Sequence, residues 1–440
     1  MTDVTLSATA SFDRALFWER GDSVRYLVAR LTAARKDEID APERTPLNIA
    51  LVIDASGSMD GGKLDAAKAA ALGLAERLTE HDRLTIVSFA SDVVVHLDAV
   101  PVTKDNARRI RSEISQLETR GMTCLSGGWF AGVECAAKVA EADFRMTPRV
   151  IILSDGRANE GISNAAELSE HAGELRLRGV LTSALGIGDD YDEQLLRGIA
   201  ENGGGRLHDA EFTTEISSVL LGELDDIFGT IVEQAKIELT VPAGAQVQVL
   251  GKAQVEVRAG CIEVLVGPIQ SGIERIAIFQ VRCPKAALHD RLEFQMVALG
   301  RAADDGTALE ATETIAVLEA AAGASNSSQP RDTDLAAVVA RTWLADIVAT
   351  ASQMNRAGAY KDAEIYMKRT QRHFGRYVAG LDGGRELVRQ VELIARSVGD
   401  PYSSRMHKEM VYQSALQVEG REDRRGSGKA SWSDRLRRGD

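Results

Sequence analysis

The sequence predicts an α/β fold: a doubly wound, mainly parallel sheet is inserted into an antiparallel β-sandwich and is followed by a C-terminal α-helical segment. Three observations support this prediction. Short apolar runs alternate with amphipathic stretches from Thr45 to about Ala235, apolar residues recur at every second position from Lys236 to Leu318, and helical spacing returns after Leu335. Alternating strands and helices are typical of parallel sheets, whereas a period of two is typical of antiparallel strands with one buried face.

Four apolar runs are predicted to form buried strands of the parallel sheet. Each is too short for a free-standing helix, and the runs are LNIALVID, RLTIVSFA, PRVIILSD and VLTSALGIG. The stretches between them, such as KLDAAKAAALGLAERL, carry apolar residues at intervals of three and four, as one buried face of a helix requires. Right-handed crossover connections between such strands produce a doubly wound sheet.

The N-terminal segment is predicted to complete the β-sandwich. VTLSATA, ALFWE and VRYLVARL have the composition of strands, but so few strands are only marginally stable on their own. We therefore expect them to pair with strands that form after residue 235. The α/β domain would then interrupt the sequence of the sandwich.

This organisation predicts six segments. Residues 320–334, AAAGASNSSQPRDTD, are small and polar and contain proline, which indicates a linker. From Gly420 to Asp440 seven basic and four acidic residues stand among glycines and serines, which favours a flexible basic tail. The predicted segments are 1–45, N-terminal strands; 46–234, the α/β domain; 235–319, the β-sandwich; 320–334, the linker; 335–418, a helical domain; and 419–440, the tail.

Charge and composition exclude several classes of protein. The 440 residues include 52 basic and 65 acidic side chains, a formal charge of −13, and such a surface repels phosphate backbones, so no nucleic-acid partner is expected. No stretch approaches the roughly 18 consecutive apolar residues of a membrane-spanning helix, and no signal-peptide pattern opens the sequence. We therefore expect a cytoplasmic protein without a membrane partner. The four cysteines form no CxxC pair and are expected to be reduced.

Candidate metal ligands follow the first apolar run, in DASGSMDGGKL. Asp54, Ser56 and Ser58 are spaced two apart in a loop at the carboxyl end of a predicted strand, which is where ligands collect in open α/β sheets. A carboxylate and two hydroxyls offer only oxygen, which suits Mg²⁺, Mn²⁺ or Ca²⁺ and lacks the sulfur and imidazole that zinc favours. The alternative is that these short polar side chains cap the helix that begins near Lys63.

The motif D-x-S-G-S-M-x-G-x-K-L resembles the metal-ion-dependent adhesion site of von Willebrand factor type A domains. The resemblance covers about residues 46–232 and implies a six-stranded, mainly parallel sheet, with further ligands at Thr123 in RGMTCLSGG and Asp155 in VIILSDGRAN. In the family the serines and the threonine contact the metal directly, while the aspartates often act through water. The threonine loop usually has two glycines before its threonine, and Met122 replaces one of them here. The implied ligand set is Asp54, Ser56, Ser58, Thr123 and Asp155.

The resemblance implies a protein-interaction module and not an enzyme. Two carboxylates neutralise the charge of a divalent ion but do not exceed it. The metal therefore still attracts one more anionic oxygen, which an Asp or Glu of a partner protein can supply. The predicted architecture is similar to that of inter-α-trypsin inhibitor heavy chains and calcium-activated chloride-channel-like proteins. We therefore interpret the chain as a bacterial, cytoplasmic adaptor or scaffold that binds its partner through Mg²⁺, with Mn²⁺ and Ca²⁺ as alternatives.

Three alternatives to this interpretation stay open. Chelatase-type relatives serve AAA+ ATPases as accessory subunits, so the chain could regulate a separate AAA+ ATPase. Intrinsic nucleotide hydrolysis is a remote alternative, because Gly57, Gly62 and Lys63 fit the G-x-x-x-x-G-K pattern of a P-loop NTPase. That pattern fails at Leu64, where Ser or Thr would hold Mg²⁺. Self-association through the final Arg-Gly-Asp tripeptide, residues 438–440, is a further hypothesis.

Overall fold

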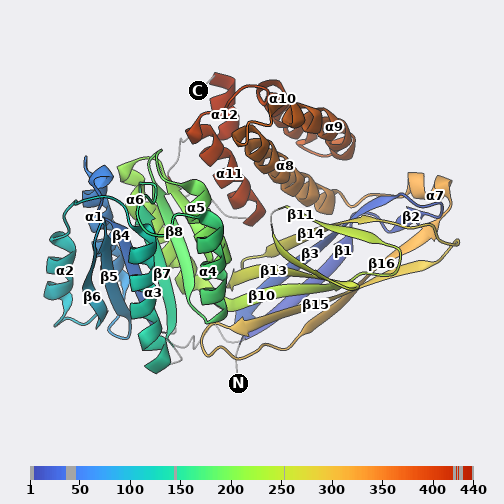
Figure 1. Ribbon diagram of the computed structural model, residues 1–440. Coiled ribbons are helices and arrows are strands. Elements are labelled where there is room, and N and C mark those ends of the chain that lie inside the picture. The colour runs from blue at the N-terminus through green and yellow to red at the C-terminus, as the bar shows by residue number, and fades with distance from the viewer. Residues whose placement is uncertain are drawn as a thin grey trace. The chain divides into compact units, whose positions relative to one another are not determined.

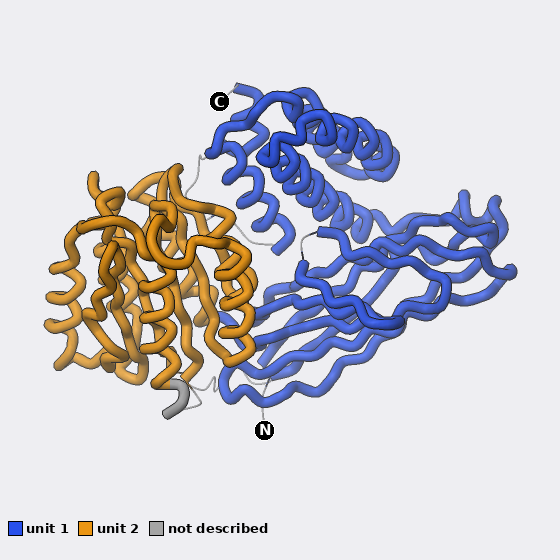
Figure 2. The backbone as a smooth tube through the Cα atoms, in the orientation of Figure 1, with its two compact units in different colours: residues 1–41, 229–423, 430–440 blue, residues 42–228, 424–429 orange. Residues whose placement is uncertain are grey.

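The chain folds into two compact units, and the sequence of unit 2 interrupts that of unit 1 (Figure 2). Unit 1 comprises residues 1–41, 229–423 and 430–440, and unit 2 comprises residues 42–228 and 424–429. The structure is a computed structural model that describes residues 4–35, 46–142, 146–251, 253–419, 423, 425 and 430–438.

Unit 2 is built on a six-stranded sheet. Its strands lie in the order β6 (Val93–Pro101), β5 (Arg83–Phe89), β4 (Leu47–Asp54), β7 (Thr147–Ser154), β8 (Leu181–Ile187) and β9 (Gly204–Ala210). Neighbouring strands are parallel except at one edge, where β6 runs antiparallel to β5. The winding direction reverses beside β4, so the carboxyl ends of β4 and β7 meet at the position where such sheets bind ligands. The predicted doubly wound, mainly parallel sheet is confirmed.

Helices cover both faces of this sheet (Figure 1). One hydrophobic core contains α1 (Lys63–Arg77), α2 (Ala107–Ser115) and α6 (Thr213–Gly229), and the other contains α3 (Leu125–Ala142), α4 (Ala165–Leu177) and α5 (Glu193–Asn202). Because side chains alternate along a strand, Leu51 of β4 lies in the first core and Val52 in the second. Burial of both faces explains why β4 is a continuous apolar run.

Two glycines allow α3 to pack closely against the sheet. A Cβ atom at Gly128 would lie 2.6 Å from the Cβ of Phe89, and a Cβ atom at Gly132 would overlap the side chain of Val52. Close-packed interiors have no room for such overlaps, so larger residues at these positions would push the helix off the sheet. The packing fixes the start of α3, and with it the loop that carries Thr123.

Unit 1 contains a sandwich of two sheets around one hydrophobic core. The first sheet has the order β1 (Val4–Phe12), β3 (Val24–Arg35), β14 (Arg275–Arg282) and β11 (Gln246–Leu250). The second has the order β12 (Gln254–Arg258), β13 (Cys261–Gln270), β10 (Thr230–Thr240), β15 (Arg291–Ala302), β16 (Thr312–Ala321) and β2 (Leu16–Trp18).

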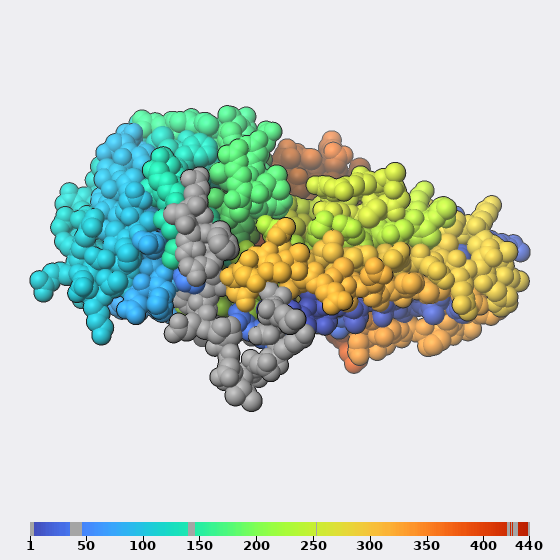
Figure 3. All heavy atoms as spheres, turned by 90° about the horizontal axis from the view of Figure 1, so that it is seen from below, coloured from blue at the N-terminus to red at the C-terminus, as the bar shows by residue number. Residues whose placement is uncertain are grey.

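The N-terminal strands complete both sheets of this sandwich. β3 pairs antiparallel with β14, and β2 pairs parallel with β16. In the space-filling view, blue N-terminal residues lie among the yellow and orange residues of the later strands (Figure 3). The expectation that the N-terminal strands join later ones is confirmed. The expected domain boundary after residue 234 is wrong, because β10 begins at Thr230 and pairs with β13 and β15 of the sandwich.

The helical segment follows the sandwich. It consists of α7 (Gly323–Ser328), α8 (Thr333–Arg356), α9 (Tyr360–Val378), α10 (Gly384–Ser397), α11 (Ser404–Glu419) and α12 (Trp432–Arg438). Residues of α8 to α12 share a hydrophobic core, and Leu335 and Val339 of α8 also pack on Tyr26 and Val28 of β3. Among the described residues, one helix, α8, is long and apolar enough to span a membrane by length and composition, and 61% of that window is buried inside the protein.

The expected linker, residues 320–334, is packed against the sandwich. It contains α7, and the side-chain amide of Gln329 bonds both backbone groups of Leu16 in β2. The guanidinium carbon of Arg331 lies 4.0 Å from the ring centroid of Tyr377, and the N–H of Asp332 donates to the carbonyl oxygen of Asp13 at 3.0 Å. The polar composition therefore reflects hydrogen bonding to neighbouring elements and not a free spacer.

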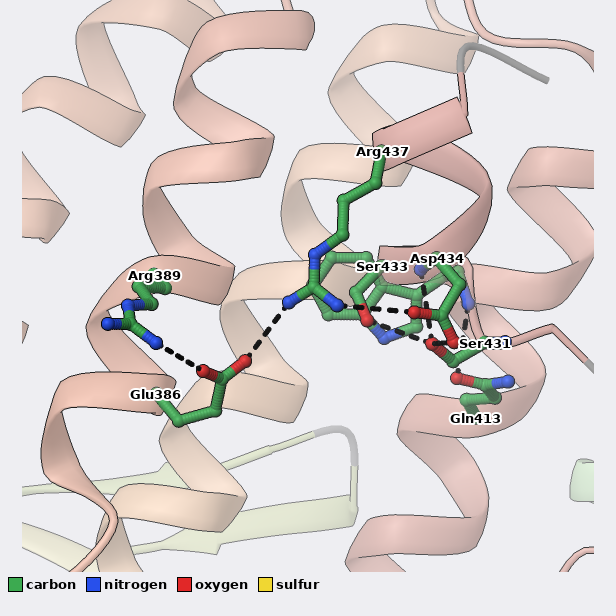
Figure 4. A network of polar contacts seen from close by, with 8 residues as sticks. Glu386, Arg389, Gln413, Ser431, Ser433, Asp434 and Arg437 are labelled. Atoms are coloured by element: carbon green, nitrogen blue, oxygen red, sulfur yellow. Dashed lines mark hydrogen bonds and ion pairs between the residues drawn. The ribbon is translucent and has the colours of Figure 1, made fainter.

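The expected flexible tail, residues 419–440, contains an ordered helix. α12 buries Trp432 in the helical core, and Arg437 pairs with Glu386 of α10 at 3.1 Å (Figure 4). Arg425, which belongs to unit 2, is buried and pairs with Asp209 at 2.9 Å. The prediction of flexibility is wrong for these described residues, because Trp432 supplies an apolar anchor that the overall composition hides. Residues 420–422, 424, 426–429, 439 and 440 lie outside the described part of the chain.

Candidate metal site

Asp54 lies at the carboxyl end of β4, beside the point where the winding of the sheet reverses. Its side chain is buried, and both carboxylate oxygens accept hydrogen bonds. Oδ1 accepts from the N–H of Ser56 at 2.9 Å, and Oδ2 accepts from the hydroxyl of Ser154 at 2.6 Å. Ser154 ends β7, the neighbouring strand. Two strand ends therefore hold the Asp54 carboxylate in one orientation.

A 3₁₀ turn at Gly57–Met59 brings the two serines of the first loop together. The Oγ atom of Ser56 lies 3.0 Å from the Oγ atom of Ser58. Met59 is buried in the hydrophobic core and anchors the turn. The residues that follow, Gly61–Gly62, have φ angles of 76° and 94°, a region that side chains rarely adopt. The chain can thus turn sharply from β4 into α1 while both hydroxyls stay beside Asp54.

The second loop, which precedes α3, is joined to the first by backbone hydrogen bonds. The N–H of Arg120 donates to the carbonyl oxygen of Ala55 at 2.6 Å, and the N–H of Gly57 donates to that of Gly121 at 3.3 Å. Gly121 has a φ angle of 56°, and a Cβ atom there would lie 2.8 Å from the Oγ of Ser91. Gly121, the glycine that remains before Thr123, is therefore required by the backbone conformation and the close packing of this loop.

Met122 occupies the position where the resembling loops have a second glycine, and its side chain is exposed. Its neighbour Thr123 is buried, and the N–H of Thr123 donates to Oδ1 of Asn159 in the third loop at 2.8 Å. The larger residue at 122 thus stays at the surface and leaves Thr123 facing the other two loops.

The three loops converge at Gly156. A Cβ atom built on this glycine would lie 3.4 Å from both Oγ of Ser58 and Oγ1 of Thr123, and 3.7 Å from Oδ2 of Asp54. The hydroxyl of Ser58 also donates to Oδ1 of Asp155 at 2.6 Å. The structure therefore brings all five residues of the motif into one cluster of oxygen atoms: Asp54, Ser56, Ser58, Thr123 and Asp155.

Three further residues belong to this cluster, and sequence reasoning misses their roles. Lys63, the first residue of α1, places Nζ 2.5 Å from Oδ2 of Asp155 and 3.3 Å from the carbonyl oxygen of Ser58. Ser154 and Asn159 orient Asp54 and Thr123. The sequence marks Lys63, because this residue belongs to the motif and lies five positions after Ser58. Ser154 directly precedes a ligand at a strand end, while nothing local marks Asn159.

The electrostatics of the cluster favour a bound cation. Burial raises the pKa of Asp54 above its ordinary value, and the charge of Asp155 raises it further, although hydrogen bonds from Ser154 and Ser56 oppose the shift. The cluster contains the two buried carboxylates of Asp54 and Asp155 and one ammonium group, that of Lys63, which pairs with Asp155, so its formal charge is −1. Carboxylates and hydroxyls are hard oxygen donors, and the donor set therefore fits Mg²⁺, Mn²⁺ or Ca²⁺.

Other kinds of site find less support. Within the described ranges, no group of three or more His, Cys, Asp or Glu side chains is arranged for a metal ion. All four cysteines are free, as their spacing predicts. Leu64 is buried in the hydrophobic core, so the position that would hold Mg²⁺ in a P-loop NTPase offers no oxygen.

Residues 48–222 match the sequence profile of the von Willebrand factor type A domain. This segment is a von Willebrand factor type A (VWA) domain. All five oxygen-bearing residues of the cluster lie inside it. VWA domains typically mediate metal-dependent protein interactions, and the cluster occupies the three loops at the carboxyl edge of the VWA sheet.

The chain spans less than half the length of the two relatives that it matches by sequence. An uncharacterised protein of Synechocystis is 34% identical over 184 residues, which are 42% of this chain and 41% of that protein. Human inter-alpha-trypsin inhibitor heavy chain H3 is 37% identical over 132 residues, which are 29% of this chain and 15% of that protein. A solved von Willebrand factor type A structure from Catenulispora acidiphila covers 91% of both chains, with 16% identity and a TM-score of 0.66. Because this likeness covers most of the chain, it shows that the fold of the sandwich and the helical segment, and not only that of the VWA domain, occurs in another protein.

Proposed function

We propose that the VWA domain binds a partner protein through a divalent cation, and that an Asp or Glu of the partner completes the coordination of this cation. The convergence of Asp54, Ser58 and Thr123 around Gly156 is the observation that carries the proposal. This convergence brings together residues that are far apart in the sequence, whereas helix capping would need only residues next to the helix. Asp54, Ser56, Ser58, Thr123 and Asp155 are the proposed ligands.

Charge decides which kind of ligand the metal would attract. Asp54 and Asp155 together balance a divalent ion, and the three hydroxyl ligands are neutral, so the ion retains affinity for an anionic oxygen. Both carboxylates are buried, whereas Ser58 is exposed. The cluster is therefore accessible from the side of Ser58, and a carboxylate on the surface of another protein can approach it there.

Mg²⁺ is the ion that we propose. Protein sites for Mg²⁺ commonly use one or two carboxylates and leave other positions to water or to a ligand, whereas Ca²⁺ prefers six to eight oxygen ligands. Mn²⁺ accepts similar oxygen donors and is the closest substitute. The proposed role needs no nucleophile and no general base, so we assign no catalytic step.

Capture of partner proteins from lysate tests the proposal. The full chain is immobilised and incubated with lysate in Mg²⁺ or in EDTA, and the retained proteins are identified by mass spectrometry. We expect proteins that are retained in Mg²⁺ and released by EDTA, and that Ser58→Ala no longer retains. Ser112→Ala, which alters an exposed serine of α2, is the matched control.

Two outcomes would carry different meanings. Retention that is equal in Mg²⁺ and EDTA, and equal for Ser58→Ala and the wild type, contradicts metal-dependent binding at this site. An AAA+ ATPase that is retained in Mg²⁺ and released by EDTA would identify the chain as its accessory subunit, which is a specific form of the proposed role.

A further inference from the structure

We propose that Lys63 tunes the metal site toward anionic ligands: its ammonium group weakens the binding of the cation and strengthens the binding of a carboxylate to the metal-loaded protein. This inference rests on the proposed function, because it concerns the same cluster. It gives Lys63 a positioning role that acts through Asp155 and does not make it a metal ligand.

The geometry places Lys63 within the cluster. Its Nζ lies 2.5 Å from Oδ2 of Asp155, and the Asp155 side chain is fully buried, while 27% of the Lys63 side chain is exposed. A Cβ atom at Gly188 would lie 3.8 Å from both Cε and Nζ of Lys63. The lysine therefore lies between the loops after β4, β7 and β8, and it reaches Asp155 from the side of α1.

Asp155 divides its two oxygen atoms between different partners. Oδ2 faces the ammonium group of Lys63, whereas Oδ1 accepts the hydroxyl of Ser58, which is itself a proposed ligand. Lys63 thus fixes the orientation of the carboxylate and leaves one oxygen turned toward the other ligands. It also takes up part of the negative charge that a cation would otherwise meet.

The charge balance of the cluster has two consequences of opposite sign. Asp54, Asp155 and Lys63 sum to −1, so a divalent cation brings the site to +1. Without the lysine the same site would be neutral once loaded. Close charges in a partly buried site interact strongly. Lys63 should therefore oppose entry of the cation and should then favour entry of an anion.

Lys68 offers a matched control on the same helix. It lies five residues after Lys63 in α1 and pairs with Asp65, whose side chain is exposed, at 3.6 Å. Lys63→Met and Lys68→Met remove the same charge from the same helix, so a general effect of net charge would appear in both. Lys63→Arg keeps the charge near Asp155 and tests rescue.

The experiment measures two affinities of the full chain by isothermal titration calorimetry at fixed ionic strength. MgCl₂ is titrated into metal-free protein, and sodium acetate is then titrated into Mg²⁺-saturated protein. For Lys63→Met we expect Mg²⁺ to bind about tenfold more tightly and acetate about tenfold more weakly, since tenfold is about 1.4 kcal/mol, close to the interaction of two unit charges about 4 Å apart at a nearly water-like dielectric. Lys68→Met and Lys63→Arg should match the wild type.

Weaker or unchanged Mg²⁺ binding by Lys63→Met, or unchanged acetate binding, overturns the inference. Equal effects of Lys63→Met and Lys68→Met overturn it as well. If the wild type binds no Mg²⁺, the proposed function itself fails. Circular dichroism verifies folding of each variant, and Lys63→Gln replaces Lys63→Met if that variant does not fold.

Discussion

Oδ2 of Asp54, at the end of β4, accepts a 2.6 Å hydrogen bond from Oγ of Ser154, at the end of β7. The two strands are neighbours in the parallel sheet, so this bond links the first and third loops of the metal site beneath the ligands. A residue with no proposed contact to the metal therefore controls the orientation of one that is proposed to bind it.

Replacing Ser154 with alanine should lower the affinity for Mg²⁺ by about tenfold, because residues that orient metal ligands commonly contribute tenfold to a hundredfold. The Asp54 carboxylate would keep only its hydrogen bonds from Ser56. Calorimetric titration with MgCl₂ measures the change. Ser414→Ala, a buried serine of α11, is the control, and an unchanged affinity of Ser154→Ala would show that the bond does not support the site.

Neutralising Asp54 should separate metal binding from stability. At an Mg²⁺ concentration of about 100 times Kd the wild type should gain about 2.7 kcal/mol in its free energy of unfolding, and Asp54→Asn should gain none. Without metal the variant should be no less stable, since burial raises the pKa of Asp54 and so disfavours its charged form. Thermal unfolding in Mg²⁺ and in EDTA measures both effects. Asp65→Asn, at an exposed carboxylate of α1, should keep the full gain.

Glu223 of α6 should stabilise the VWA domain in a pH-dependent manner. Burial alone would raise its pKa, but the charge and hydrogen bond of His208, the charge of Arg206 and the hydrogen bond of Ser183 lower it below the ordinary value. A lowered pKa in the folded state gives stability that is fully present above the ordinary value of 4.5 and is lost as the pH falls through the folded-state pKa.

The substitution Glu223→Gln should therefore cost about 3 kcal/mol at pH 7, because it breaks a buried charge cluster. Below pH 4.5 the difference from the wild type should shrink. Urea unfolding at pH 7 and at pH 3.5 measures it. Glu256→Gln, at an exposed ion pair with Arg258, should change stability little at either pH, and a pH-independent cost of Glu223→Gln would contradict the assignment.

Close packing of α3 should make Gly128 intolerant of any side chain. Gly128→Ala would place Cβ 2.6 Å from the buried side chain of Phe89, and such overpacking typically costs about 1–3 kcal/mol. Gly173 lies within α4 with no atom within 4 Å of its Cβ position, so Gly173→Ala should instead stabilise by up to about 1 kcal/mol. Chemical denaturation of both variants tests this opposite sign.

Docking of α12 should depend on one aromatic residue. Trp432→Ala should destabilise the helical segment by about 3–5 kcal/mol, whereas Arg437→Ala, which removes ion pairs to Glu386 and Asp434, should cost less than about 1 kcal/mol. Limited proteolysis followed by mass spectrometry should show faster cleavage within residues 430–438 for Trp432→Ala only. Equal cleavage of the two variants would mean that the tryptophan does not anchor the helix.

The strands that could be predicted from the sequence are those with uniform surroundings. β4 and β7 are buried on both faces and therefore appear as continuous apolar runs. β6 and β9 are not evident from the pattern. β6 is an edge strand with exposed Val93 and Val95 and an irregular register, and β9 starts with glycines and has buried polar residues, His208 and Asp209, before its last residue.

The same distinction applies to the metal site. Its five proposed ligands stand in short motifs at fixed spacing, so they could be named in advance. The partners of those ligands could not, because Lys63 and Asp155 are 92 positions apart and only the fold brings them together. The order of the tail depends on tertiary contacts in the same way, because Trp432 packs against residues of α8 to α11 that only the fold brings beside it.

The insertion of the VWA domain between β3 and β10 determines the order in which the parts of the chain can fold during synthesis. β1 and β3 can form a hairpin as soon as they leave the ribosome, but β14, the next strand of their sheet, ends only at Arg282. At roughly 5–20 residues per second, that hairpin waits on the order of ten seconds or more for its neighbour. The VWA domain emerges complete during this interval, so it should be the first part of the nascent chain to become resistant to protease.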